Sequence, residues 1–103
     1  MIAGYPSTMA AYFIVNAKVN DAERLQKYVE GALPIVDVHP CEVLVLDNDV
    51  EIVEGTPPGH RMVVVKFESK EGFNKFYNST EYQAILGDRL ASTDGFAVLT
   101  DGL

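Results

Sequence analysis

Short apolar runs alternate along the chain with segments in which apolar residues recur every three or four positions. The runs are rich in β-branched and aromatic residues, which is typical of strands. Four of them predict strands at residues 11–19, 41–46, 61–67 and 95–100. Helical spacing over residues 21 to about 38 predicts an amphipathic helix, and two shorter helices are expected to begin near Ser69 and Thr80.

Polar residues at the predicted helix starts indicate where each helix begins. Asn20 is followed three positions later by Glu23, the pattern of a capping box, so we expect Asn20 to cap the first helix. Thr80 and Gln83 repeat this pattern at the third helix. Pro34 lies inside the first helix, and its missing N–H is expected to bend or break the last turn.

The order strand, helix, strand, strand, helix, strand predicts a ferredoxin-like α+β sandwich. Its antiparallel four-stranded sheet would have the order 4-1-3-2, with the helices on one face. A sheet with one wet face should alternate apolar and polar residues. The stretches "YFIV", "VLVL" and "MVVV" do not alternate. Because the helices cover only one face, we expect a second copy to cover the other, in a homodimer packed sheet to sheet.

Length and charge narrow the class of protein. The 103 residues suffice for one domain, here residues 11–103 after an N-terminal extension, residues 1–10. A net charge of −7 disfavours nucleic acid and anionic membrane as partners, because both select a basic surface. No apolar run approaches the roughly 18 residues of a membrane span. The uncharged start does not resemble a secretory signal, and Cys41 is the only cysteine, so we expect a reducing, cytoplasmic location.

Strand parity places several polar residues on one face of the predicted sheet. Tyr12 and Asn16 share that face of the first strand, Glu42 lies on it in the second, and Lys66 in the third. Antiparallel pairing brings Lys66 close to Tyr12 and Glu42. This set is a candidate ligand pocket. The alternative is an ordinary cross-strand Glu–Lys pair at the margin of the sheet.

The stretch "STEYQAILGDRL" holds a second candidate site. Tyr82 and Arg89 are seven residues apart and therefore share a helix face, where they would orient a carboxylate or an enolate. The alternative is a tyrosine at the core margin and an arginine paired with Glu54, Asp88 or a partner chain. Arg61, at the start of the third strand, has the same two interpretations.

The two histidines lack the sequence context of a metal site. His39 follows the first helix and His60 lies in a loop, and neither has a second ligand at a metal-binding spacing. We expect His39 to act as a cation at the helix end, and we also retain it as a ligand contact. No metal or other cofactor is predicted, with haem binding as the less favoured alternative.

The run "FYNSTEYQAILGDR" and its flanking segments resemble the domain-of-unknown-function 1330 family over nearly the whole chain after about residue 10. The match is most specific at Phe76, Tyr77, Ser79, Glu81, Tyr82, Gln83 and Arg89. That family is similar in fold to the dimeric α/β-barrel group, so the resemblance implies a ferredoxin-like homodimer. The wider group includes metal-free monooxygenases, isomerases, haem enzymes and members without known activity, so the resemblance implies no particular reaction.

The functional hypothesis is a small homodimer that binds an organic carbonyl or aromatic compound, with metal-free acid–base chemistry if it is an enzyme. The alternatives are a non-catalytic ligand-binding or structural dimer and, less favoured, a haem-binding or monooxygenase-like enzyme. The proposed roles are a base (Glu42 or Glu54), a hydrogen-bond donor (Tyr12 or Tyr82) and an anion clamp (Arg61 or Arg89). Asn16, Lys66 and His39 complete the set of candidate ligand contacts.

Overall fold

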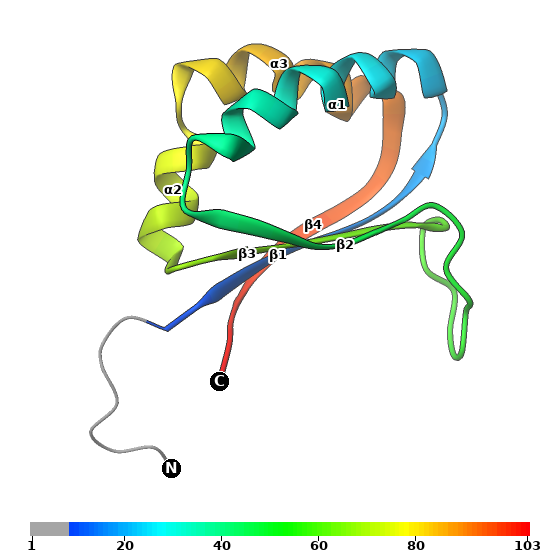
Figure 1. Ribbon diagram of the computed structural model, residues 1–103. Coiled ribbons are helices and arrows are strands. Elements are labelled where there is room, and N and C mark those ends of the chain that lie inside the picture. Colours follow the sequence, from blue (N-terminus) through cyan, green and yellow to red (C-terminus); the bar gives the residue numbers. More distant parts are fainter. Residues whose placement is uncertain (1–8) are drawn as a thin grey trace.

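The computed structural model describes residues 9–103, which form four strands and three helices (Figure 1). The strands are β1 (Ala11–Val19), β2 (Cys41–Asp47), β3 (Arg61–Phe67) and β4 (Thr93–Asp101). The helices are α1 (Ala22–Asp37), α2 (Lys70–Tyr77) and α3 (Thr80–Ser92). Most of the predicted N-terminal extension, residues 1–8, lies outside the described residues.

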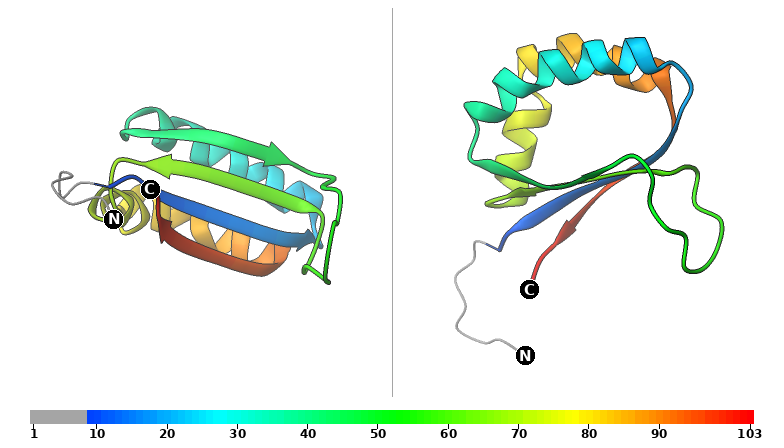
Figure 2. Two further views of the ribbon diagram at one scale, coloured as in Figure 1. Left: turned by 90° about the horizontal axis from the view of Figure 1, so that it is seen from below. Right: turned by 45° about the vertical axis from the view of Figure 1, so that its right-hand side comes forward.

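The strands form one antiparallel sheet in the order β2-β3-β1-β4. This is the predicted 4-1-3-2 order, so the ferredoxin-like fold is confirmed. All three helices lie over one face of the sheet, and Figure 2 shows the strands uncovered when the molecule is viewed from the other side. None of the helices in residues 9–103 has the length and hydropathy needed to cross a membrane.

The N-cap residues of two helices lie one position away from those that the sequence predicted. Asp21, rather than Asn20, caps α1, because its Oδ1 accepts a hydrogen bond from the backbone N–H three residues later at 3.1 Å. Ser79, rather than Thr80, caps α3 in the same way at 3.2 Å. Pro34 does not break the last turn of α1, which continues beyond it.

A β-bulge in β2 overturns part of the parity argument. The register pairs Val43 with Val65 but then Val45 with Val64, which leaves Leu44 as an extra residue. An extra residue reverses the alternation of the side chains that follow it. Strict alternation from Glu42 would place Leu46 on the face opposite the helices, but beyond the bulge Leu46 points into the space between sheet and helices.

The hydrophobic core lies between the helix-facing side of the sheet and the helices. At the α2 end it is largely aromatic, and Phe67 and Tyr82 are almost completely buried there. Full burial of such a side chain contributes about 1.5–3 kcal/mol. The buried core cluster is Phe13, Val15, Ala17, Ile35, Val65, Phe67, Phe73, Phe76, Tyr82 and Leu86.

The loop of residues 48–60 joins β2 to β3 and projects to the side of the sheet away from the helices (Figures 1 and 2). Asn16 of β1 anchors its end. The Asn16 amide donates to the Gly59 carbonyl at 3.0 Å and to the Arg61 carbonyl at 3.2 Å, and its Oδ1 accepts from the Gly59 N–H at 3.2 Å. A side chain at Gly59 would overlap the backbone of Ala17, which requires glycine there. Asn16, predicted as a ligand contact, thus has its polar atoms engaged by the backbone.

Substituting Asn16 with alanine is expected to lower the free energy of unfolding by about 2–3 kcal/mol, because buried backbone groups lose their partners. Urea denaturation measures the change. Asn74→Ala, at an exposed position of α2, is the matched control and should change stability by less than about 0.5 kcal/mol. Equal stabilities of the two variants would contradict the anchoring role.

Candidate functional site

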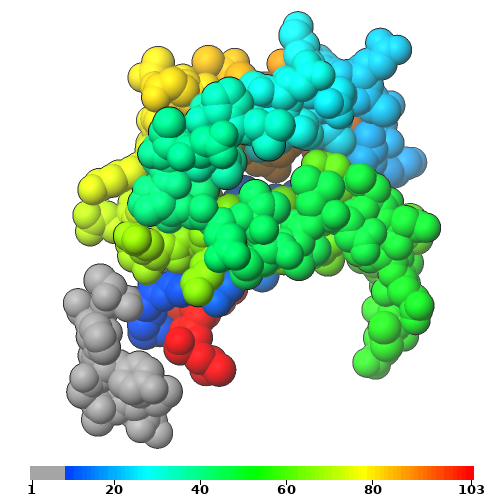
Figure 3. Space-filling model, in the orientation of Figure 1, coloured from blue at the N-terminus to red at the C-terminus, as the bar shows by residue number. Residues whose placement is uncertain are grey.

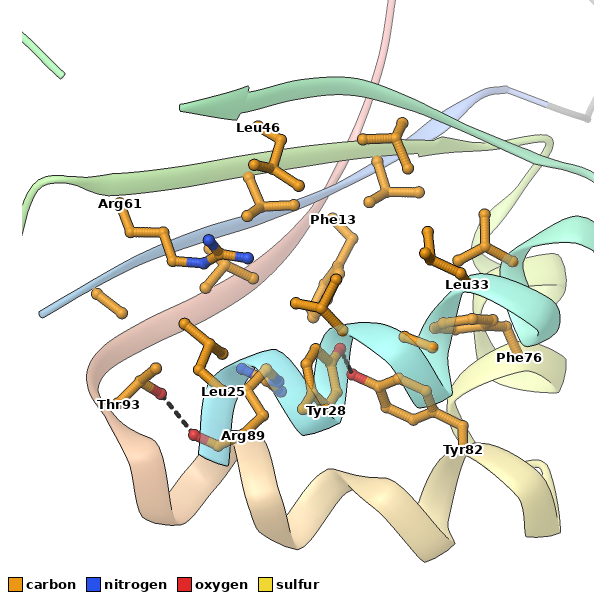
Figure 4. A pocket seen from close by; sticks show the side chains of 18 residues that line it. Phe13, Leu25, Tyr28, Leu33, Leu46, Arg61, Phe76, Tyr82, Arg89 and Thr93 are labelled. Atoms are coloured by element: carbon orange, nitrogen blue, oxygen red, sulfur yellow. Dashed lines mark hydrogen bonds between the residues drawn. The ribbon is translucent and has the colours of Figure 1, made fainter. Parts of the chain in front are cut away.

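A pocket of about 100 Å³ lies between the sheet and helices α1 and α3 (Figure 4). Most of its lining is aliphatic or aromatic and comes from α1, β1, β2 and β3. The polar side chains in the lining are Tyr28, Arg61, Tyr82, Arg89 and Thr93. The lining therefore contains two cations and no carboxylate.

Arg89 reaches the pocket from α3 and is only 8% exposed. Its Nε has no hydrogen-bond partner within residues 9–103. The guanidinium carbon lies 5.9 Å from the ring centre of Phe13 and 6.0 Å from that of Tyr28, in cation–π contact with both. Asp88, one of the predicted partners, instead accepts from Arg24 at 2.8 Å. A buried arginine with free donors is suited to an anion.

Arg61 reaches the same end of the pocket from the sheet. It is the first residue of β3, and Figure 4 shows its guanidinium extending toward the side where Arg89 lies. Its Nη1 donates to Asn48 Oδ1 at 2.6 Å. Burial lowers the pKa of the Arg61 guanidinium, and the nearby Tyr28 acts in the opposite direction. A bound anion would favour the charged form of Arg61.

Two tyrosines meet in the middle of the pocket. The hydroxyl oxygens of Tyr28 and Tyr82 are 2.7 Å apart, and the rings pack edge to face. Burial, followed by the effect of Tyr82, raises the pKa of Tyr28 far above its usual range. One hydroxyl of this pair donates to the other, so the second O–H is left to donate to a ligand.

Replacing Tyr28 with phenylalanine is expected to flatten the loss of stability at alkaline pH. The unfolded chain releases the phenol proton near pH 10, whereas the folded chain retains it. Above about pH 10, Tyr28 therefore lowers the free energy of unfolding by up to about 1.4 kcal/mol per pH unit. At lower pH, the contribution of Tyr28 to stability does not change with pH. Urea denaturation at pH 8 to 11 measures the slope. Tyr12→Phe is the control, and a wild-type slope in Tyr28→Phe would refute the assignment.

The predicted cluster of Tyr12, Glu42 and Lys66 forms on the other face of the sheet. The register pairs Lys66 with both Tyr12 and Glu42, as the strand directions required. Glu42 and Lys66 are exposed. Arg89 lies on the helix-covered face, so the structure does not bring it together with these three residues.

Two further candidates, Glu54 and His39, and the cysteine Cys41 lie outside the pocket lining. Glu54 is exposed in the loop of residues 48–60. His39 Nδ1 lies 2.8 Å from the Ile35 carbonyl oxygen, and its ring packs edge to face on Phe76. Burial raises the pKa of the Cys41 thiol, which disfavours the reactive thiolate. Within residues 9–103, no three His, Cys, Asp or Glu residues are grouped closely enough to hold a metal ion.

Three of the predicted candidates, Tyr82, Arg89 and Arg61, line the pocket, and Tyr28 also lines it without having been predicted as a candidate. The helical spacing of Tyr28 fits the apolar stripe of α1, which predicts only a core residue. The useful signal was its hydroxyl, because a buried tyrosine hydroxyl needs a hydrogen-bond partner. Tyr82, on the facing helix α3, is the hydrogen-bond partner of Tyr28.

The family of the chain follows from the extent of the match. A family model described as "Domain of unknown function (DUF1330)" matches residues 10–103. The chain belongs to this family. The resemblance of the "STEYQAILGDRL" region to DUF1330 is thereby confirmed for the whole domain. No curated protein matched the DUF1330 chain.

Solved structures support the fold of this DUF1330 domain. A protein of unknown function from Rhodopseudomonas palustris is similar at a TM-score of 0.78 and 12% identity, over 93% of this chain and 84% of that one. A putative antibiotic biosynthesis monooxygenase from Caulobacter crescentus has a TM-score of 0.65 and 16% identity, over 92% and 89%. A dimeric ferredoxin-like protein of unknown function from Thermobifida fusca has a TM-score of 0.64 and 15% identity, over 96% of each chain. Identities this low establish the fold alone.

Proposed function

We propose that this DUF1330 protein binds a small organic anion in the pocket between α1, α3 and the sheet. The observation that carries the proposal is the buried Arg89, whose Nε lacks a partner within the described residues. Leaving such a donor unsatisfied costs about 1–3 kcal/mol or more. A carboxylate is the ligand group that satisfies a guanidinium best, because it accepts two parallel N–H bonds.

The composition of the pocket lining supports an organic rather than an inorganic anion. Arg61 and Arg89 supply positive charge at one end, whereas the chain as a whole carries −7. The free O–H of the Tyr28–Tyr82 pair supplies a neutral donor. Aliphatic and aromatic side chains line the rest and are suited to the apolar body of the ligand.

The same geometry favours binding over acid–base catalysis. A general base must lie within hydrogen-bond reach of the proton it removes. The pocket lining contains neither a carboxylate nor a histidine, and the predicted bases Glu42 and Glu54 are exposed on other parts of the protein. Non-catalytic ligand binding is therefore the better supported function.

We also propose that the binding protein is a homodimer packed through the face of the sheet that the helices leave open. The strand register aligns Val45, Val64, Ile14 and Val98 in one row across all four strands on this face. Apolar residues in a continuous row favour burial against a second copy. The similar protein from Thermobifida fusca is described as dimeric, which supports the proposal.

Titration of the purified protein with hexanoate and with hexanamide tests the proposed anion site. The two compounds have similar shapes and differ in charge, so hexanoate should bind at least about tenfold more tightly if a charge-assisted bond of 1.5–3 kcal/mol is made. Calorimetry gives both affinities, and the Arg89 Nε–H signal in a ¹⁵N NMR spectrum should shift with hexanoate. Equal affinities, or an unmoved Arg89 signal, would overturn the proposal.

A further inference from the structure

The lining of the pocket extends along most of α1. Its lining includes Leu25 near the start of α1 and Val36 near its end, positions that are about 16 Å apart along a helix. Its volume is about 100 Å³. A compact cavity of roughly 150 Å³ accepts one benzene ring, so a smaller volume spread along three helical turns suits a single alkyl chain better.

The polar groups of the pocket are confined to part of this length. Figure 4 shows Arg61, Arg89 and Thr93 gathered at the Leu25 end, with the tyrosine hydroxyls farther along. The opposite end is entirely apolar. It is lined by Leu33, Val36, Val43, Val65 and Phe76. The pocket therefore matches a ligand with one charged end and one long apolar part.

The apolar end of the pocket opens between α1 and β2. Two side chains that line this end of the pocket are also well exposed: Leu33 at 57% and Val43 at 42%. Figure 3 shows the surface hollowed between these two elements. Exposed aliphatic side chains at a pocket mouth would gain burial against a ligand chain that leaves through it.

We infer that the anion is an unbranched aliphatic monocarboxylic acid whose chain lies along α1. Its carboxylate binds Arg61 and Arg89 beside the tyrosine pair, and its chain emerges between Leu33 and Val43. This inference rests on the proposed function and adds the class of ligand. A second carboxylate that stays within the apolar part of the pocket would lose water without a partner, so dicarboxylates too short to reach the mouth are excluded.

A chain-length series of butanoate, hexanoate, octanoate and decanoate tests the inference by calorimetry. Affinity should rise by up to about fourfold per added methylene through octanoate, as burial of each methylene predicts. Adipate, which has the length of hexanoate and a second carboxylate that would stay inside the pocket, should bind at least about 100-fold more weakly than hexanoate. Benzoate should bind more weakly than hexanoate.

A variant at the pocket mouth tests how much the alkyl chain of the ligand contributes to affinity, separately from its carboxylate. Leu33→Gln changes an exposed residue and should reduce octanoate affinity about threefold or more with little effect on butanoate. Leu90→Gln, at an exposed position of α3, is the matched control and should leave the whole series unchanged.

The outcomes distinguish the two proposals. If hexanoate binds better than hexanamide but affinity does not depend on chain length, the inferred ligand class is wrong and the anion site stands. If adipate or benzoate matches hexanoate, the inferred class is also wrong. If no anion is preferred over its amide, both proposals fail.

Discussion

Substituting Arg89 with methionine should weaken hexanoate binding at least about thirtyfold while the folded protein stays as stable as the wild type. The variant loses a charge-assisted contact worth about 2 kcal/mol, which corresponds to that factor in affinity. Methionine has a similar length, and its flexible apolar side chain packs well in an apolar pocket. Calorimetric titration measures the affinity.

The stability of this variant follows from two opposing effects. Removing Arg89 eliminates a buried Nε without a partner, which gains about 1–3 kcal/mol. It also removes the contacts with the rings of Phe13 and Tyr28, which costs about 0.5–2 kcal/mol. The free energy of unfolding should therefore remain within about 1 kcal/mol of the wild-type value or exceed it. Urea denaturation without ligand provides the measurement.

Arg24→Met is the matched control, because Arg24 is a half-exposed arginine paired with Asp88 on the outer side of the helices. It should leave hexanoate affinity unchanged and alter stability by less than about 1 kcal/mol. An Arg89→Met protein that binds hexanoate normally and loses more than about 3 kcal/mol of stability would show a structural role for Arg89.

The fold could be predicted because local signals agreed with one another along the whole chain. Strand-like runs and helical periodicity left few permitted topologies, and the 4-1-3-2 order was among them. The errors arose where one residue decides the geometry. Strict alternation cannot show that Leu44 is extra, and neighbouring polar residues such as Asn20 and Asp21 compete equally as a cap.

The site was predictable only where its residues share one element. Tyr82 and Arg89 lie two turns apart on α3, so their common face follows from helical spacing. Tyr28 and Arg61 come from α1 and β3, and only the packing of α1 over the sheet brings them beside Arg89. Strand parity placed Tyr12, Glu42 and Lys66 on one face but failed for Leu46 beyond the bulge. It also could not show that Arg89 and Lys66 would lie on opposite faces of the sheet.

Placing lysine at Ile14 should separate the proposed dimer without unfolding the protomer. Ile14 lies on the open face in the central strand β1, between Val64 and Val98 in the register. In a dimer packed through this face, each copy would bury one new charge, and an unpaired buried charge costs several kcal/mol. The dimer dissociation constant should therefore rise at least about 100-fold, as measured by analytical ultracentrifugation.

The protomer of Ile14→Lys should remain folded, because the lysine stays in water once the copies separate, and circular dichroism checks this point. Leu90→Lys introduces the same charge on the exposed outer side of α3 and should remain dimeric. Hexanoate binding should survive in the Ile14→Lys monomer, since the residues that line the pocket lie on the helix-covered side of the sheet, away from Ile14. Loss of binding together with the dimer would instead indicate that the anion site depends on the partner copy.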